Sequence, residues 1–184
     1  MSNKTKVITG PETRWRYVNV FEPKSINGGP EKFSVSLVIS KDDTDTMDKV
    51  RTAVEDAYYA GLPRLKGDDN KIPELSEINS PIHDGDVERP GDEVYANAYF
   101  INATSTSAPG IVDAKCKTIT DKEEVYSGVY GRASITLYAY NYNGNRGIAA
   151  GLNNLQKISD GEPLGSRSSA VEDFAEYDDD DFLK

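Results

Sequence analysis

The stretch GVYGRASITLYAYNYNGNRGIAAGLNNLQKI, residues 128–158, decides the fold. Its first half alternates: Ile135, Leu137 and Ala139 share one face, and hydroxyl-bearing side chains share the other. This period of two predicts a β-strand with one buried face. The NYNGNRG motif that follows centres on an Asn-Gly pair, a strong signal for a tight hairpin turn. Residues 148–158 are therefore predicted to return as the partner strand.

Four other segments carry strand signals. Residues 12–21 (ETRWRYVNVF) and 32–40 (KFSVSLVIS) alternate over most of their length and are rich in β-branched and aromatic residues. In 32–40 four apolar side chains share one face, and the other face holds three serines and Val38, which predicts a half-buried antiparallel strand. The remaining candidates are residues 93–103 and a shorter segment, 111–119.

The segment after the second strand changes period. From residue 42 to Gly61, apolar residues recur every three or four positions, which predicts an amphipathic helix. Asp42, Asp43 or Thr44 can cap its start, and Gly61 can end it. Residues 62–92 hold four prolines and little periodicity, so we expect a long inserted loop. Five or six strands with one helix predict a mainly β protein, a small barrel or a sandwich.

The chain ends on EDFAEYDDDDFLK, residues 172–184, which carries seven acids and one base. The whole chain has a net charge of −10, so the other 171 residues carry only about −4. A segment this charged cannot bury enough apolar surface to order itself, so we expect a disordered tail after a domain spanning 1–171. Its aromatic residues are unnecessary for solubility and suggest that a partner protein reads it. The candidate partner-binding residues are Asp178, Asp179, Asp180, Asp181 and Phe182.

Composition excludes much chemistry. One cysteine and one histidine, His83, cannot form a Cys/His zinc site within one chain. His83 lies in a stretch rich in Pro, Gly and Asp, and we interpret it as a solvated loop residue. The sequence contains no phosphate-binding glycine loop and no apolar run long enough to span a membrane, and its first ten residues lack the apolar stretch expected of a signal peptide. We therefore expect a cytoplasmic protein that is not an enzyme and uses neither metal nor cofactor.

Tyr138, Tyr140 and Tyr142 are two residues apart, so on a strand they point the same way. Bases of single-stranded nucleic acid stack on such rings irrespective of sequence, while basic side chains follow the phosphates. Arg132 and Arg146 flank the row and are predicted to contact the phosphates. For any one tyrosine, packing within the sheet is an alternative explanation, because tyrosine is a good strand former.

A second group pairs aromatic and basic residues on another predicted strand. Arg14, Trp15, Arg16 and Tyr17 are therefore also predicted to bind nucleic acid. Trp15 is the only tryptophan, and burial in the core is an alternative for it. An acidic tail can compete with nucleic acid for the basic residues of both groups, because tethering raises its effective concentration.

Residues 126–174, and less distinctly 33–41, the predicted helix and 110–120, resemble a bacteriophage family of single-stranded-DNA-binding proteins. The resemblance implies an oligonucleotide/oligosaccharide-binding (OB) fold, sequence-independent binding of single-stranded DNA in phage replication or recombination, and a tail that contacts replication proteins. Two alternatives come from other classes. One is a phage structural β-protein, such as a virion or tail component. The other is a nuclease that holds a metal with the acids of the 62–92 loop.

Overall fold

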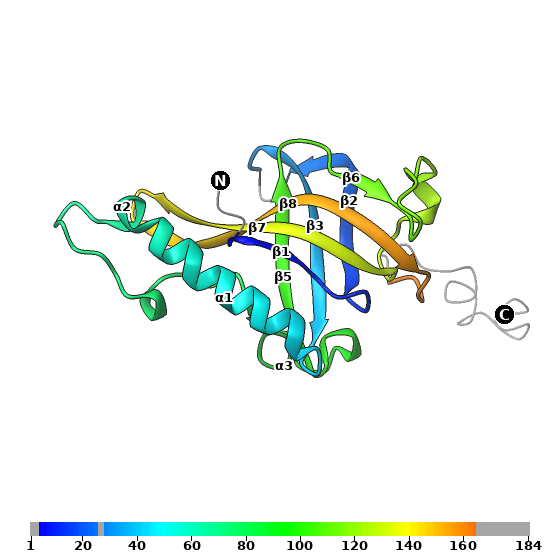
Figure 1. Cartoon of the computed structure of the whole chain (residues 1–184), viewed down its shortest axis with the longest axis horizontal. Helices are drawn as coiled ribbons and strands as arrows, with labels where there is room; N and C mark the ends of the chain where they lie inside the picture. Colours follow the sequence, from blue (N-terminus) through cyan, green and yellow to red (C-terminus); the bar gives the residue numbers. More distant parts are fainter. Residues whose placement is uncertain (1–3, 26–27, 165–184) are drawn as a thin grey trace, which may run out of the picture.

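The hairpin predicted from the opening stretch is the longest feature of the computed structural model, which describes residues 4–25 and 28–164 (Figure 1). Strands β7 (Tyr130–Tyr142) and β8 (Asn145–Ser159) pair antiparallel along their whole length. Asn143 and Gly144 form the two-residue turn with φ angles of 52° and 90°. Positive φ at both positions is the requirement of a type I′ turn, which explains the Asn-Gly pair.

Five strands close into a ring. The pairing runs from β7 to β2 (Arg14–Ser25), β3 (Glu31–Ser40), β5 (Ala98–Ser105) and β8, and the β7–β8 hairpin completes the circle. Strand β1 (Lys6–Ile8) adds to the edge of β7, and β6 (Gly110–Val112) adds to β8. The mainly β, OB-like architecture is thus confirmed. Two pairings, β5 with β8 and β6 with β8, are parallel, which side-chain alternation did not predict.

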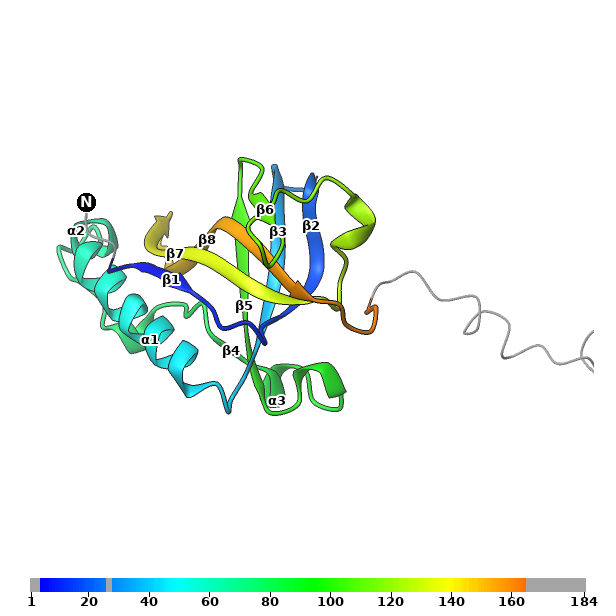
Figure 2. The same ribbon diagram turned by 45° about the vertical axis from the view of Figure 1, so that its right-hand side comes forward.

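Helix α1 (Thr44–Ala60) lies across the end of the ring beneath the hairpin (Figure 2). Its start and end agree with prediction: the Asp43 side chain accepts a hydrogen bond from the Thr46 backbone N–H, and Gly61 caps the end. Its buried stripe packs chiefly against β7 and closes the core. The residues of that stripe are Thr46, Met47, Val50, Ala53, Val54 and Ala57.

The insertion is more ordered than a loop. Within 62–97 lie α2 (Leu62–Leu65), the 3₁₀ turn η1 (Leu75–Glu77), the two-residue β4 (His83–Asp84), α3 (Gly85–Glu88) and η2 (Glu93–Tyr95). A further 3₁₀ turn, η3 (Lys122–Glu124), precedes β7. The expected strand 93–103 begins only at Ala98, because residues 93–95 form η2.

The insertion also covers the outer face of β3, which corrects the expectation of a half-buried strand. Residues 34–39 are all buried. Val38 packs with Tyr95, Ala98 and Phe100 in a small second cluster outside the ring. His83 stacks on Phe100 with ring centroids 4.8 Å apart, and its Nδ1 lies 2.9 Å from a Glu88 carboxylate oxygen. His83 is therefore a packed residue and not a freely solvated one.

Candidate nucleic-acid interface

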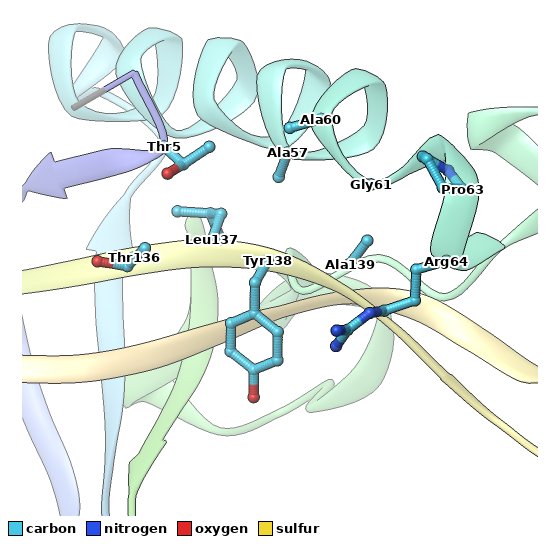
Figure 3. Close-up of a pocket in the computed structure, with 10 residues that line it drawn as sticks. All are labelled: Thr5, Ala57, Ala60, Gly61, Pro63, Arg64, Thr136, Leu137, Tyr138 and Ala139. Atoms are coloured by element: carbon cyan, nitrogen blue, oxygen red, sulfur yellow. The ribbon is translucent and has the colours of Figure 1, made fainter. Parts of the chain in front are cut away.

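The three hairpin tyrosines share the face of β7 that points away from α1. Figure 3 shows Leu137 directed toward α1 and Tyr138 directed to the opposite side of the strand. Leu137 and Ala139 are buried, whereas Tyr138 is 42% exposed and Tyr142 is 73% exposed. The predicted alternation is confirmed, and it leaves two large aromatic side chains open to solvent.

Small residues of β8 lie beside these rings. Tyr138 pairs with Ala149, Tyr140 with Gly147, and Tyr142 with Asn145. The Tyr138 ring also leans over Gly151, where an added Cβ would meet it at an ordinary contact distance of 3.6 Å. Partial burial, followed by the neighbouring tyrosines, raises the pKa of the Tyr138 phenol above its ordinary value. An uncharged ring whose neighbours on β8 have small side chains is suited to stacking with a base.

Tyr140 and Tyr142 stand close enough to act together. Their ring centroids lie 6.0 Å apart with an interplanar angle of 32°, near the spacing of about 6–7 Å expected for alternate residues of a strand. Tyr140 is half-buried, because its hydroxyl lies against Asn79 of the insertion. Tyr138 and Tyr142 therefore offer the larger open surfaces of the row.

Charge is distributed unevenly over the sheet. None of the 31 acidic residues of the chain falls within β1, β5, β7 or β8, although these strands pair side by side. We call their outer surface the acid-free face. The side chains of these four strands therefore add no negative charge of their own that would repel a polyanion. Acids of neighbouring elements border them: Asp43 and Asp45 line a pocket with Arg132, and Asp48 lines one with Lys6. The segregation appears only once the pairing order is known.

Two basic residues lie on the acid-free face without an ion pair in the described part of the chain. Arg132 is exposed on the same side of β7 as the tyrosines, six residues and about 20 Å from Tyr138. Lys6 of β1 pairs directly with Thr136 and is exposed. Sequence reasoning missed Lys6, because a three-residue strand gives almost no periodic signal.

Arg146 does not join the tyrosine row. It lies one residue out of phase with Gly147, so its side chain projects from the opposite face of the hairpin. There its Nη1 donates a hydrogen bond of 3.1 Å to the carbonyl oxygen of Leu65. The expectation that Arg146 flanks the rings is therefore wrong in this structure, because alternation along β8 turns it toward α2.

For Trp15 the structure shows the alternative, burial in the core. Trp15 is fully buried, and its Nε1 donates a hydrogen bond of 3.2 Å to the carbonyl oxygen of Gly131 inside the ring of strands. Its ring offers no open face to a base. Arg14 is half-buried, and its guanidinium donates to the backbone carbonyls of Gly128 and Glu162. These bonds tie β2 to the segments that flank β7 and β8.

Arg16 and Tyr17 belong to a second aromatic and basic group, here called the Arg16 cluster: Arg16, Tyr17, Arg89, Asp92 and Tyr95. The Arg16 guanidinium lies over the Tyr17 ring at 4.9 Å and the Tyr95 ring at 5.1 Å. Its Nη1 is 3.0 Å from an Asp92 carboxylate oxygen. Partial burial lowers the pKa of Arg16, but the Asp92 hydrogen bond and nearby charges outweigh this and raise it.

Tyr17 is the exposed member of the Arg16 cluster. It is 54% exposed and has a φ angle of 51°, at a shift of register between β2 and β3. Such an irregularity turns a side chain away from the regular sheet. Tyr17 therefore stays available to a ligand, whereas Arg16 already has aromatic and carboxylate partners.

Other kinds of site have less support in the described residues. Residues 4–25 and 28–164 contain no group of three or more His, Cys, Asp or Glu side chains placed to hold a metal ion. No helix in these ranges is both long and apolar enough to cross a membrane. The tail residues predicted to bind partners, Asp178 to Phe182, lie outside the described part of the chain.

Known structures share this architecture. The single-stranded DNA-binding protein from bacteriophage Enc34, solved in complex with ssDNA, is 20% identical and superposes with a TM-score of 0.69 over 88% of this chain and 90% of that one. The corresponding protein gp2.5 of bacteriophage T7 is 16% identical, with a TM-score of 0.62 over 95% and 94% of the two chains. At these identities the likeness establishes the fold.

The fold and the aromatic, acid-free face thus define an OB-type β-protein of the class found among phage single-stranded-DNA-binding proteins. The chain belongs to the Enterobacter phage Enc34 ssDNA-binding protein family, whose family model matches residues 5–183. A sequence relative is protein p50 of Acyrthosiphon pisum secondary endosymbiont phage 1, which is 28% identical over 168 residues, 88% of each chain. The resemblance recognised from residues 126–174 is confirmed.

Proposed function

We propose that this chain binds single-stranded DNA without sequence preference and acts in phage DNA replication or recombination. The observation that carries the proposal is the row of tyrosines on an acid-free face of an otherwise acidic protein. Membership of the Enc34 ssDNA-binding protein family supports it.

In the proposed complex, unpaired bases stack on Tyr138 and Tyr142, with Tyr140 between them. Each base that stacks on an aromatic side chain contributes about 1–3 kcal/mol, and any base can do so. Duplex DNA hides its base faces within its own stack, so it gains only the phosphate contacts. Lys6 and Arg132 are positioned to neutralise phosphates, which makes the affinity fall as salt rises.

We further propose that the acidic segment 172–184 modulates DNA binding and contacts phage replication proteins, through Asp178 to Asp181 and Phe182. Seven acids in thirteen residues resemble the charge of a nucleic-acid strand, and a tethered competitor acts at high effective concentration. The place of action that follows is the cytoplasm of the host cell.

The test is a fluorescence-anisotropy titration with end-labelled oligothymidylate and a duplex of equal length, at two salt concentrations. Labelled DNA is preferable to intrinsic fluorescence, because the only tryptophan is buried in the core. We expect tighter binding to the single strand and weaker binding at higher salt. Equal or tighter binding to the duplex, or no binding at low salt, contradicts the proposal and favours a structural phage protein.

A matched pair of variants locates the interface. Tyr142→Ala on the hairpin should weaken single-strand binding by about 1–3 kcal/mol. Tyr59→Ala removes a ring that is similarly exposed, 67% against 73%, but lies on α1. Because Tyr59 lies outside the tyrosine row, on a helix that carries several acids, Tyr59→Ala should leave the affinity unchanged. Equal losses in both variants would contradict the hairpin assignment.

A further inference from the structure

The insertion pairs with the backbone of the hairpin at Asn79. Its backbone N–H donates to the carbonyl of Arg146 at 3.0 Å, and its own carbonyl accepts from the Ile148 N–H at 3.0 Å. These bonds make a one-residue parallel bridge opposite Gly147, on the outer part of β8. The insertion therefore supports the part of the hairpin that carries Tyr140 and Tyr142, here called the outer hairpin (residues 138–149).

The side chain of Asn79 continues this contact onto the tyrosine row. Its Nδ2 donates to the Tyr140 hydroxyl at 3.3 Å and to Asn145 Oδ1 at 2.9 Å. Tyr140 is the middle ring of the row, 6.0 Å from Tyr142. The hydrogen bond from Asn79 restricts the orientation of the Tyr140 ring. It therefore also restricts the space between the Tyr140 and Tyr142 rings.

Gly147 provides the room for this arrangement. A Cβ placed on Gly147 would lie 2.7 Å from the Asn79 Cβ, the Asn79 carbonyl oxygen and the Tyr140 hydroxyl oxygen. Contacts this short do not occur, so any larger residue must push Asn79 and Tyr140 away. The φ angle of Gly147 is not positive. Position 147 therefore requires glycine for steric reasons and not because of backbone strain.

The opposite face of the hairpin is held as well. Asn141 Nδ2 donates to the Arg64 carbonyl at 3.1 Å, and Arg146 Nη1 donates to the Leu65 carbonyl at 3.1 Å. With both faces tied to residues 64–79, the outer hairpin is restrained before any ligand arrives. A binding surface that is already ordered loses less entropy on association.

We propose that Asn79 and Gly147 are positioning residues for base stacking: together they set the direction of the Tyr140 ring without touching DNA themselves. The inference rests on the proposed function and adds a role for the 62–92 insertion. Loss of either residue should weaken single-strand binding through Tyr140, while the fold of the ring of strands is kept.

The first experiment compares Gly147→Ala with Gly151→Ala. Both glycines lie on the outer side of β8, but a Cβ at Gly151 meets nothing closer than 3.6 Å. We expect Gly147→Ala to lower the affinity for oligothymidylate several-fold and Gly151→Ala to lower it less, because a Cβ at Gly151 meets the Tyr138 ring only at an ordinary contact distance. Equal affinities for the two variants, both folded by circular dichroism, would overturn the role of Gly147.

The second experiment is a double-mutant cycle with Asn79→Ala and Tyr140→Phe, which remain measurable if Gly147→Ala fails to fold. Loss of one hydrogen bond of this kind corresponds to an affinity loss of about two- to tenfold. Asn79→Ala should show that loss alone but no further loss in the Tyr140→Phe background, because the hydroxyl it holds is gone. Additive losses, or none from Asn79→Ala, would overturn the inference.

Two controls separate this inference from the proposed function. Tyr58→Phe removes a different hydrogen bond of the insertion, from the Tyr58 hydroxyl to the Pro73 carbonyl at 2.7 Å, and should leave the affinity unchanged. Tyr142→Ala tests the stacking surface itself. If Tyr142→Ala weakens binding and Asn79→Ala does not, only the positioning role fails; if neither does, the proposed interface fails.

Discussion

The hairpin tyrosines and the Arg16 cluster look alike in sequence, but the structure separates them. Both combine aromatic and basic residues on a strand, and both were predicted to contact nucleic acid. On the hairpin, Tyr138 and Tyr142 lie open on a face without acids. In the Arg16 cluster, the guanidinium already lies over two rings and pairs with Asp92. The same residue types remain open to solvent or contact one another, depending on which partners the fold supplies.

This difference has an energetic consequence. A base that stacks on Tyr142 displaces only water, whereas a phosphate that approaches Arg16 must compete with the Asp92 carboxylate 3.0 Å away. The hairpin should therefore contribute more to single-strand binding than the Arg16 cluster does.

The largest expected effect concerns the residue beneath the Arg16 cluster. Trp15→Ala should lower the free energy of unfolding by about 3–5 kcal/mol, because it removes a fully buried ring and leaves a cavity. Urea unfolding measures the loss. An unchanged free energy of unfolding combined with weakened DNA binding would show that Trp15 contacts the DNA. The assignment of Trp15 to the core and not to the interface would then be wrong.

The next largest effect is the loss of DNA affinity expected when one tyrosine is removed from each region. Tyr138→Ala should weaken single-strand binding by about 1–3 kcal/mol, and Tyr17→Ala should cost less, although Tyr17 is the more exposed of the two. Anisotropy titrations of both variants under one buffer condition make the comparison. A larger loss from Tyr17→Ala would reverse the ranking and place the main stacking surface at β2.

A smaller effect is expected from the acidic tail. Removal of residues 172–184 should strengthen single-strand binding, most at low salt, where charges interact over longer distances. Lys6 and Arg132 have no ion pair in the described part of the chain, so the acid-free face is the surface that we expect the tail to occupy. A salt series of the full-length and truncated chains tests this. Unchanged or weaker binding after truncation contradicts competition by the tail.

The smallest expected effect is a local loss of stability at low pH. Beside the Arg16 cluster, the Lys41 ammonium contacts Asp84 and Asp86 at 2.8 Å each, and these hydrogen bonds lower the pKa of both carboxyls below their ordinary 3.8. Their stabilising contribution is therefore present above that ordinary value and is lost as the pH falls through the lowered pKa. The outer hairpin is held largely by neutral groups.

Acidification below pH about 4 should thus loosen residues 84–97 before residues 138–149. Native-state hydrogen exchange, corrected for the intrinsic pH dependence of exchange, measures both segments in one sample. Simultaneous loosening of the two segments would show that ionic contacts do not distinguish them.

Local features were predicted well where the local signal is strong. The hairpin, its Asn-Gly turn and the buried face of β7 follow from a period of two and from the positive φ that a type I′ turn requires. Helix α1 starts and ends at predicted caps, because capping depends on residues adjacent in sequence. The family resemblance rests on the same stretch.

The features that sequence patterns left open all involve contacts between distant residues. Trp15 and Arg16 are neighbours in sequence, but the closure of the ring buries one, and the insertion brings Asp92 to the other. Arg146 faces α2 because one step along β8 reverses the direction of a side chain.

The sequence by itself thus determined the hairpin, the helix, the tyrosine row and the family, since each depends on periodicity or on adjacent residues. Only the tertiary structure decided which aromatic and basic residues remain available. That outcome depends on the pairing of β1, β5, β7 and β8 into one acid-free face, and on Asn79 reaching Tyr140 across 61 positions of the chain. Burial and charge pairing are properties of neighbours in space, and those neighbours exist only after the ring has closed.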